Sequence, residues 1–175
     1  MPASQESLDA WVLATWAQAV AYARGMLRDR SEAEDVVHDC YCSLLRKAAD
    51  YDLPADGRKL LFRAVTNACF KRNARRRPLF GLFSPRADGS LPADPTVAEP
   101  LDQAISLELE RDIADALSRL PEQQRAALQL KCLDHTLDEI ADLLAISPSN
   151  AGVLVHRARQ ALAARLGKHL KEGAE

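Results

Sequence analysis

Two clusters of basic side chains equip this chain to bind a polyanion. Five of the seven residues from Lys71 to Arg77 are Lys or Arg, and a second cluster begins at Arg157 and Arg159. Such side chains neutralise the phosphates of a nucleic acid, and this contact supplies much of the sequence-independent affinity. The formal net charge is only −2 because acidic residues between the clusters balance them. The pattern therefore predicts contact with a phosphate chain at two separate places.

No catalytic constellation accompanies these clusters. The histidines are scattered, and neither a G-x-S-x-G nucleophile motif nor a glycine-rich phosphate loop occurs. Asp134 and His135 are expected to be solvated at a turn. The cysteines match no zinc-ligand spacing and are expected to be reduced thiols, with a redox or metal role for Cys40, Cys42 and His38 as the alternative. We predict no enzyme activity, no metal and no cofactor.

The segment from Leu120 to Arg159 carries the signals of a helix-turn-helix. Thr136 and Glu139 are spaced as a capping box in front of an apolar stripe. A Ser-Pro pair marks the start of the next helix at Pro148. The turn between them is so short that it requires a sharp crossing of two packed helices. This motif places its second helix in the major groove, so the segment predicts binding to duplex DNA.

Helical periodicity also dominates the N-terminal half. It predicts three amphipathic helices, at residues 8–27, 31–49 and 59–76. Ser31 and Glu34 form a second capping box at the start of the middle helix. Residues 50–58 contain Pro and Gly and read as a loop. Trp16 and Leu45 are expected to face the core.

Residues 78–100 are rich in Pro, Gly and Ser and lack periodicity, which is typical of a flexible linker. Period-two alternation, the signal of a half-buried strand, is absent. The fold class predicted is all-α, with two small helical domains joined by the flexible linker, the C-terminal one a helix-turn-helix. The expected division is a first domain at 1–77, the linker at 78–100 and a second domain at 101–175.

The start of the chain lacks the basic region of a signal peptide. No apolar run approaches the ~20 residues that a membrane helix needs. We therefore expect a cytoplasmic protein without membrane insertion.

Three sequence pieces, taken together, resemble the extracytoplasmic-function group of bacterial RNA polymerase sigma factors. They are RDRSEAEDVVHDCY at Arg28 to Tyr41, FRAVTNACFKRNARRR at Phe62 to Arg77, and LPEQQRAALQL followed by the helix-turn-helix. Their order and spacing match the second and fourth conserved regions of that group. The resemblance implies an initiation factor that binds core RNA polymerase and promoter DNA, and an anti-sigma factor is a usual inhibitory partner in the group.

The resemblance implies a polymerase-binding surface at the start of the second helix, which meets the clamp helices of the beta-prime subunit, while the second domain meets the beta flap. Its residues are Glu32, Glu34, Asp35 and Asp39. Carboxylates in a first helical turn also complement the helix dipole, at ~0.3–1 kcal/mol each. Asp39 lies a turn further along, so the dipole accounts for it less well.

The resemblance also implies that the third helix binds and melts the minus-ten element. A melted strand needs a cationic track and pockets for unstacked bases. The candidate residues are Phe62, Arg63, Asn67, Lys71, Arg72, Arg75 and Arg76. Asn67 falls where the family has an asparagine lining a pocket for a flipped base. The chain has Leu60 where many members carry Trp, which puts stacking at that position in doubt and leaves Phe62 and Tyr51 as the stacking candidates.

In the second domain, the helix from Pro148 is implied to read the minus-thirty-five element. The candidate contacts are Ser149, Asn150, Val153, His156, Arg157 and Arg159. Family members often have Arg where this chain has Gly152 and Leu154, so fewer bidentate guanine contacts are expected. Val153 is equally consistent with contact to thymine methyls and with the core.

Two other functions fit part of the sequence. A helix-turn-helix regulator that acts without polymerase would explain the second domain but not the first. A helical protein-interaction adaptor would use the charges for partners other than DNA. Both alternatives predict no new transcription start sites when the chain is mixed with core polymerase.

Overall fold

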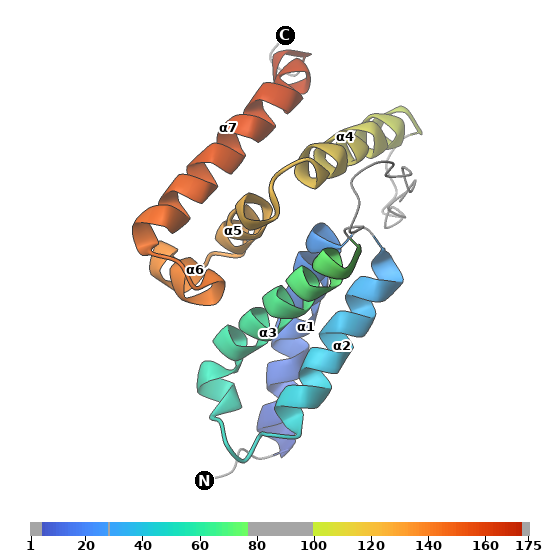
Figure 1. Ribbon diagram of the computed structural model, residues 1–175. Coiled ribbons are helices and arrows are strands. Elements are labelled where there is room, and N and C mark those ends of the chain that lie inside the picture. Colours follow the sequence, from blue (N-terminus) through green and yellow to red (C-terminus); the bar gives the residue numbers. More distant parts are fainter. Residues whose placement is uncertain (1–4, 28, 77–99, 173–175) are drawn as a thin grey trace.

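The computed structural model describes residues 5–27, 29–76 and 100–172, and this part of the chain contains seven helices and no strand. The all-α prediction is therefore confirmed (Figure 1). The helices are α1 (Gln5–Met26), α2 (Arg30–Leu45), α3 (Leu53–Arg76), α4 (Pro100–Ser118), α5 (Glu122–Cys132), α6 (Leu137–Leu144) and α7 (Pro148–Glu172). The predicted linker lies outside the described residues except for Pro100, where α4 begins.

Helices α1, α2 and α3 pack against one another and form what we call the first unit. Its core contains fully buried apolar side chains from each helix, such as Ala23, Val37 and Leu61. Sequence periodicity predicted this core because buried residues recur on one face of each helix. Trp16 and Leu45 depart from that expectation, since each keeps 38% of its surface exposed.

Both boundaries between the first three helices differ from the predicted ones. Asp29 caps α2, accepting a hydrogen bond from the backbone N of Glu32 at 3.0 Å, so Ser31 is not the cap. The predicted loop at residues 50–58 is mostly helix, because α3 already begins at Leu53. Asp52 stabilises that start by accepting from the backbone N of Ala55 at 3.2 Å.

Helices α4 to α7 form the second unit, in which α7 packs on α4, α5 and α6. The predicted capping box of α6 is confirmed: Thr136 Oγ1 accepts from Glu139 N, and Thr136 N donates to Glu139 Oε2 at 2.8 Å. Ala145 ends α6 with φ 55°, in the left-handed region. Ser147 caps the next helix, accepting from Asn150 N at 3.2 Å. These short-range contacts set the sharp crossing of α6 and α7.

The two units pack directly against each other. Helix α6 lies on α3, while α5 and α4 contact α1 (Figure 1). Most of the buried apolar side chains of the two units form one continuous cluster, which includes Phe62 of α3 and Ile140 of α6, while Leu120, Leu128 and Ala158 form a separate one. The sequence predicted two domains joined by a flexible linker and gave no indication of this contact. The contact covers part of α3, the helix predicted to bind DNA.

Candidate nucleic-acid interface

A groove of about 310 Å³ runs between α2 and α3, and we call it the α2–α3 groove. Its walls combine apolar side chains with acidic and basic ones: Val36, Asp39, Cys40, Ser43, Ala64, Ala68, Lys71, Arg72 and Arg75. Lys71 and Arg75 are exposed and Arg72 is half-buried. The structure thus brings three of the predicted minus-ten cations together beside Asp39, one of the predicted polymerase-binding acids.

Glu32 connects the two predicted binding surfaces. Its Oε1 lies 3.4 Å from Arg72 Nη1, and its Oε2 forms an ion pair with Arg76. Only 14% of the Glu32 side chain is exposed. An acid predicted for polymerase and two cations predicted for DNA therefore neutralise one another in this conformation.

The other three predicted acids differ in how freely they face solvent. Glu34 pairs with Arg24 at 2.5 Å and with Arg30 at 3.2 Å, and its hydrogen bond to Arg24 is the main reason that its pKa is lowered. Asp35 and Asp39 are exposed on α2. A partner approaching α2 therefore meets Asp35 and Asp39 without first breaking an ion pair between described residues.

A second, smaller pocket of about 170 Å³ lies at the start of α3, and we call it the Tyr51 pocket. It is lined by Tyr51, Asp56, Lys59, Leu60 and Arg63. Of these, sequence reasoning named Arg63 as a cation for the minus-ten element and Tyr51 as a candidate for stacking. Treating residues 50–58 as a loop hid the helical spacing that brings Asp56 beside Lys59, Leu60 and Arg63.

Asn67 is exposed on α3, one turn beyond Arg63, and it lines neither the α2–α3 groove nor the Tyr51 pocket. Neither of these pockets is therefore the base pocket that Asn67 was expected to line. Its amide remains available on the surface of the helix that carries the cations.

Phe62 does not face solvent, contrary to the prediction that it stands beside the cationic track. The side chain is fully buried, with its ring 5.7 Å from that of Tyr22 and 5.0 Å from that of His135. The guanidinium carbon of Arg58 lies 5.9 Å from the ring centroid. Tyr22 of the first unit and His135 of the second therefore both pack on Phe62, and in this conformation the ring is closed to a strand.

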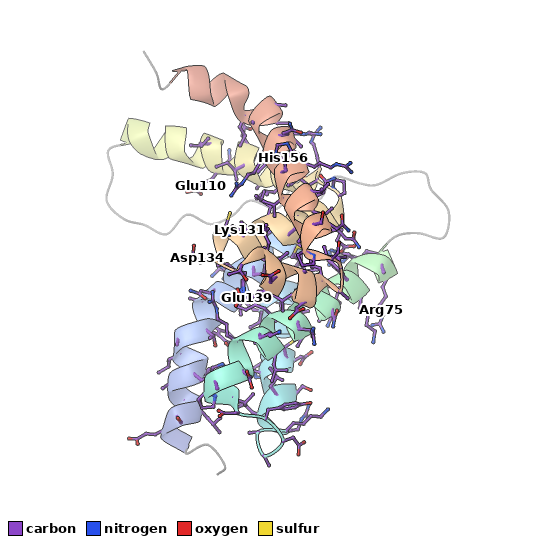
Figure 2. All side chains as sticks on the ribbon, turned by 90° about the vertical axis from the view of Figure 1, so that its left-hand side faces the viewer. Arg75, Glu110, Lys131, Asp134, Glu139 and His156 are labelled. Atoms are coloured by element: carbon purple, nitrogen blue, oxygen red, sulfur yellow. The ribbon has the colours of Figure 1, made fainter. Side chains whose placement is uncertain are left out.

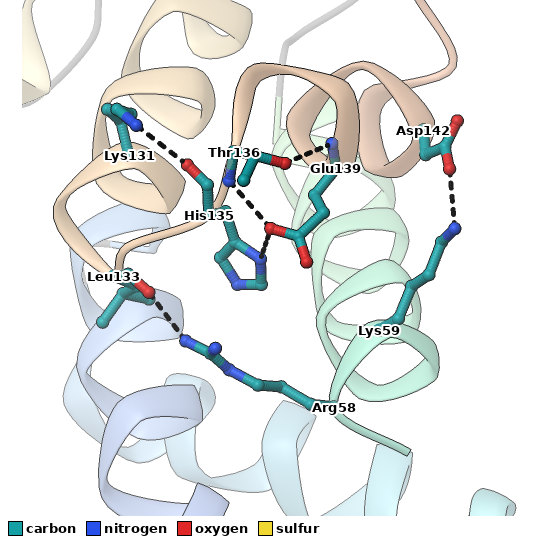
Figure 3. Close-up of polar contacts among 8 residues, drawn as sticks. All are labelled: Arg58, Lys59, Lys131, Leu133, His135, Thr136, Glu139 and Asp142. Carbon is teal, nitrogen blue, oxygen red and sulfur yellow. Dashed lines mark hydrogen bonds and ion pairs between the residues drawn. The ribbon is translucent and has the colours of Figure 1, made fainter. Parts of the chain in front are cut away.

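Polar contacts from the second unit also engage the first turns of α3 (Figure 3). Lys59 Nζ lies 2.6 Å from Asp142 Oδ2, and Arg63 Nη2 donates to the backbone O of Asp142 at 2.8 Å. Arg58 Nη2 donates to the backbone O of Leu133 at 2.7 Å. Two of the residues that line the Tyr51 pocket, Lys59 and Arg63, are thus held by α6.

His135 was expected to be solvated, but only 3% of its surface is exposed. Neither ring nitrogen has a hydrogen-bond partner, and Nδ1 lies 3.6 Å from Glu139 Oε2. Burial is the main cause that lowers the pKa of His135, and the positive charge of Arg58 adds to it. The surroundings of the imidazole between the two units therefore disfavour its protonated form.

Helix α7 presents the predicted minus-thirty-five contacts on its outer face. Ala151, Val155 and Ala158 are buried and pack inward. All of the predicted minus-thirty-five contacts are exposed: Ser149, Asn150, Val153, His156, Arg157 and Arg159. Val153 keeps 41% of its surface exposed, which favours the surface over the core for this residue. Figure 2 shows His156 on α7 and Arg75 near the end of α3, on separate parts of the molecule.

The cysteines show no arrangement for metal binding within residues 5–27, 29–76 and 100–172, where no group of three or more candidate ligands occurs. Burial raises the pKa of the Cys40 thiol to about 11 and that of Cys69 to about 12. Such thiols are poor nucleophiles near neutral pH.

Within residues 5–27, 29–76 and 100–172, no helix has the length and apolar character needed to span a membrane.

Comparison with protein families assigns both units. The family model "Sigma-70 region 2" matches residues 8–78, and "Sigma-70, region 4" matches residues 110–162, so that the two span most of the chain. The first match covers the helices that carry the α2–α3 groove. The second covers the helix-turn-helix.

Two curated sigma factors are similar to this chain. The ECF RNA polymerase sigma factor SigW of Bacillus subtilis (strain 168) is 29% identical over 147 residues, which are 81% of this chain and 79% of that protein. The probable RNA polymerase sigma factor RfaY of Xanthomonas campestris pv. campestris is 28% identical over 142 residues. That alignment covers 79% of this chain but only 35% of the Xanthomonas protein.

The family models agree in order and position with the two helical units, and the helix-turn-helix geometry agrees with the second of them. The chain therefore belongs to the extracytoplasmic-function group of the sigma-70 family, whose members are transcription initiation factors.

Proposed function

We propose that this chain attaches to core RNA polymerase through α2, reads the minus-thirty-five element with α7 and opens the minus-ten element with α3. The observation that supports this most is the separation of two exposed nucleic-acid surfaces, the outer face of α7 and the cationic end of α3, on units that match different sigma regions. One promoter can then be held at two places. The domain division at 1–77, 78–100 and 101–175 is part of this proposal.

The outer face of α7 suits major-groove binding. Its first turn carries Ser149 and Asn150, whose polar side chains can contact base edges, and Arg157 lies about two turns further along for phosphates. The Ser147 cap leaves the helix start ordered and exposed. We propose that Asn150 and Val153 read bases while His156, Arg157 and Arg159 hold the backbone.

The start of α3 suits an unpaired base. The Tyr51 pocket, at about 170 Å³, is bordered by an aromatic ring for stacking, the carboxylate of Asp56, and the cations Lys59 and Arg63 for phosphates. Extruding a base from a duplex costs a few kcal/mol, which such contacts must offset. We propose that the melted strand enters here and then follows Asn67, Lys71, Arg72, Arg75 and Arg76 along α3.

The exposed acids of α2 suit a basic partner surface. Asp35 and Asp39 are both exposed, and we propose that they meet the clamp helices of the beta-prime subunit. Glu34 joins them once Arg24 and Arg30 are displaced, whereas Glu32 is engaged with α3. The beta flap is the proposed contact of the second unit. This role places the protein where the polymerase works, in the cytoplasm.

The proposal is tested by transcription with purified components. The full chain is mixed with bacterial core polymerase and fragmented genomic DNA from its source organism, and new transcript starts are mapped. We expect discrete start sites that depend on the chain. If no such start sites appear and the chain does not associate with core polymerase, its function is instead that of a polymerase-independent regulator or an adaptor.

The polymerase-binding acids are tested in the same assay with the double variant Asp35→Asn and Asp39→Asn. We expect its affinity for core polymerase to fall at least tenfold while its binding to duplex DNA is unchanged. Glu6→Gln, which removes an exposed acid from α1, is the matched control and is expected to leave core affinity unchanged. Equal core affinity in all three proteins would contradict the assignment of α2.

A further inference from the structure

Two side chains that can bind a metal lie side by side on the outer face of α2. His38 and Cys42 are four positions apart, so they project from adjacent turns on the same face of the helix. Cys42 Sγ lies 3.7 Å from His38 Nε2 and 3.9 Å from His38 Nδ1. His38 is exposed and Cys42 is partly exposed, so both can be reached from solvent. The proposed function uses neither residue.

The separation of the two side chains is that of two ligands on one zinc ion. Zinc binds sulfur at about 2.3 Å and imidazole nitrogen at about 2.0–2.1 Å, and a tetrahedral angle between these bonds puts the ligand atoms about 3.6 Å apart. The 3.7 Å between Cys42 Sγ and His38 Nε2 agrees with that value. Two ligands four positions apart on a helix are also the arrangement of the H-E-x-x-H zinc motif. The pair is therefore already positioned to hold zinc once the thiol releases its proton.

One chain supplies only half of such a site. Structural zinc sites have four protein ligands. Within the described parts of one chain, no group of three or more His, Cys, Asp or Glu side chains could hold a metal, so the other ligands must come from another molecule. Two identical pairs related by a two-fold axis would give two sulfur and two nitrogen ligands, which is the Cys₂His₂ set of structural zinc.

The surface around the pair is complementary in charge to a second copy of itself. Asp35, Asp39, Cys42 and Arg46 follow one another at intervals of four, three and four residues, which places them along one face of α2 and its C-cap. The face is thus acidic at its start and basic at its end. If two copies run antiparallel with the metal at the midpoint, Asp35 of each chain lies near Arg46 of the other. A parallel arrangement would put like charges together, which is unfavourable.

This face of α2 is also open to a partner. Helix α2 packs on α1 and α3, and Figure 1 shows it on the side of the first unit away from α6 and α7. Leu45, one turn beyond Cys42, keeps 38% of its surface exposed and gives the face an apolar edge. A second copy can therefore approach α2 without displacing the second unit.

We propose that His38 and Cys42 form half of a zinc site, which the same two residues of a second copy of this chain complete. The dimer requires the metal, because a contact between two single helices buries far less than the ~1,200 Å² at the low end of stable interfaces. The dimer covers Asp35 and Asp39, so zinc bridging and attachment to polymerase exclude each other. Only this last consequence rests on the proposed function.

The first test measures zinc content and mass. The full chain, without an affinity tag, is titrated with zinc in a reductant that does not bind the metal, and its mass is measured by light scattering. We expect one zinc ion per two chains and a doubling of the 19.2 kDa mass, which a chelator reverses.

The variants in this test remove one ligand at a time. Cys42→Ser and His38→Asn should each weaken zinc binding by more than about 100-fold, beyond what loss of an outer-shell partner causes, and should stay monomeric. Cys132→Ser removes an exposed thiol from α5 and is the matched control. It is expected to dimerise with zinc as the wild type does.

The second test identifies the ligands by their spectra. Cobalt(II) is used in place of zinc, because its absorption reports both tetrahedral geometry and thiolate ligation. We expect the wild type to show a thiolate-to-cobalt charge-transfer band, and Cys42→His to lose it. A wild-type spectrum without that band would exclude Cys42 as a ligand.

The third test examines the antiparallel pairing. Arg46→Asp places an acid opposite Asp35 of the other chain, and the two surface pairs lost per dimer should weaken dimerisation in zinc by about 3- to 30-fold. The double variant Asp35→Arg with Arg46→Asp exchanges the two charges and should restore it. Equal dimer affinity in all three proteins would overturn the antiparallel arrangement.

The inference is supported if zinc produces a dimer that requires both His38 and Cys42 but not Cys132. It is overturned if the chain stays monomeric in zinc, if one ion binds per chain, or if Cys42→Ser still dimerises. All of these measurements are made without polymerase or DNA, so they decide the inference independently of the transcription assay. Circular dichroism melts confirm that each variant is folded.

Discussion

The rings of Phe62 and His135 lie edge to face, with centroids 5.0 Å apart, although they belong to different units. Phe62 is fully buried and His135 is 97% buried by the same contact and its surroundings. Edge-to-face aromatic pairs are worth about 0.5–1.5 kcal/mol beyond the area that they bury. Because one ring is an imidazole without a hydrogen-bond partner, protonation acts directly on the docking of the two units.

Docking is expected to weaken in acid. The pKa of His135 is lowered in the docked state, chiefly by burial and then by Arg58. When the units separate, His135 loses its contacts with Phe62 and Arg58 and regains a pKa nearer the ordinary value of about 6.5. The equilibrium constant for docking is therefore largest above about pH 6.5. Below that pH it falls by up to tenfold per pH unit, until the pH reaches the lowered pKa of docked His135. Small-angle scattering between pH 7.5 and 5.5 measures this as an increase in the radius of gyration.

The matched variant for this prediction is His135→Phe, which keeps a ring against Phe62 and cannot take up a proton. Arg58, Glu139, Asp134 and Lys131 also face this site from α3, α6, the intervening turn and α5, and all are retained in the variant. We expect its radius of gyration to be constant over the same range. An equal response in the variant and the wild type would assign the effect to other groups.

Gly57→Ala is expected to destabilise the first unit. A Cβ at this position would lie 2.6 Å from Nε1 and 2.7 Å from Cε2 of the buried Trp11 ring, which is rigid. Overpacking costs about 1–3 kcal/mol, and the better helix propensity of Ala returns at most about 1 kcal/mol. The net loss of about 1–2 kcal/mol should lower Tm by about 2–8 °C. Gly167→Ala, in open space, should leave Tm unchanged or raise it slightly.

Thr136→Ala is expected to weaken the start of α6. The hydroxyl accepts from Glu139 N at 3.2 Å, and loss of such a cap costs about 0.5–2 kcal/mol. Urea unfolding should report this loss, and Thr136→Ser, which retains the hydroxyl, should recover most of it. If Ala and Ser were equally stable, the capping box would not be contributing to the stability of the helix-turn-helix.

Arg157→Ala is expected to remove one phosphate contact from the α7 surface. The slope of log affinity against log salt for a 20-base-pair duplex should become shallower by about 0.9. Arg165→Ala, two turns further along α7 and also exposed, is the control with the same charge change. An unaltered slope for Arg157→Ala would exclude this residue from the duplex interface.

The helix-turn-helix was predictable because its signals are short-range. Thr136 and Glu139 are three positions apart, Ser147 directly precedes Pro148, and each pair acts within a single turn of helix. The inward face of α7 followed from periodicity in the same way. Local chemistry of this kind is present in the sequence before any tertiary contact forms.

The start of α3 was mispredicted because Pro54 and Gly57 were read as helix breakers. Pro54 lies in the first turn, where its missing N–H has no partner to lose. Gly57 is required by the Trp11 ring on α1, a contact across 46 positions that no local pattern reveals. The error concealed the place of Asp56 in the Tyr51 pocket, since Asp56 shares a face with Lys59, Leu60 and Arg63 only when this segment is helical.

The burial of Phe62 and His135 could not be read from the sequence for a related reason. His135 stands between Asp134 and Thr136 in the chain, and Phe62 directly precedes Arg63. The contact between the two rings is made only where two units separated by a linker dock. Periodicity reports the face that a helix buries within its own unit. It carries no information about which exposed side chains a second unit will cover.

Under the proposed function, the carboxylate of Glu32, shared between Arg72 and Arg76, would make polymerase binding and strand binding mutually reinforcing. A partner cation that attracts Glu32 releases two guanidinium groups, which then seek phosphates. Equally, phosphates that attract those guanidiniums free the carboxylate for the partner. By thermodynamic reciprocity each event must favour the other by the same factor. A single acidic side chain can thus help ensure that the cationic end of α3 is most attractive to nucleic acid when the enzyme is already attached.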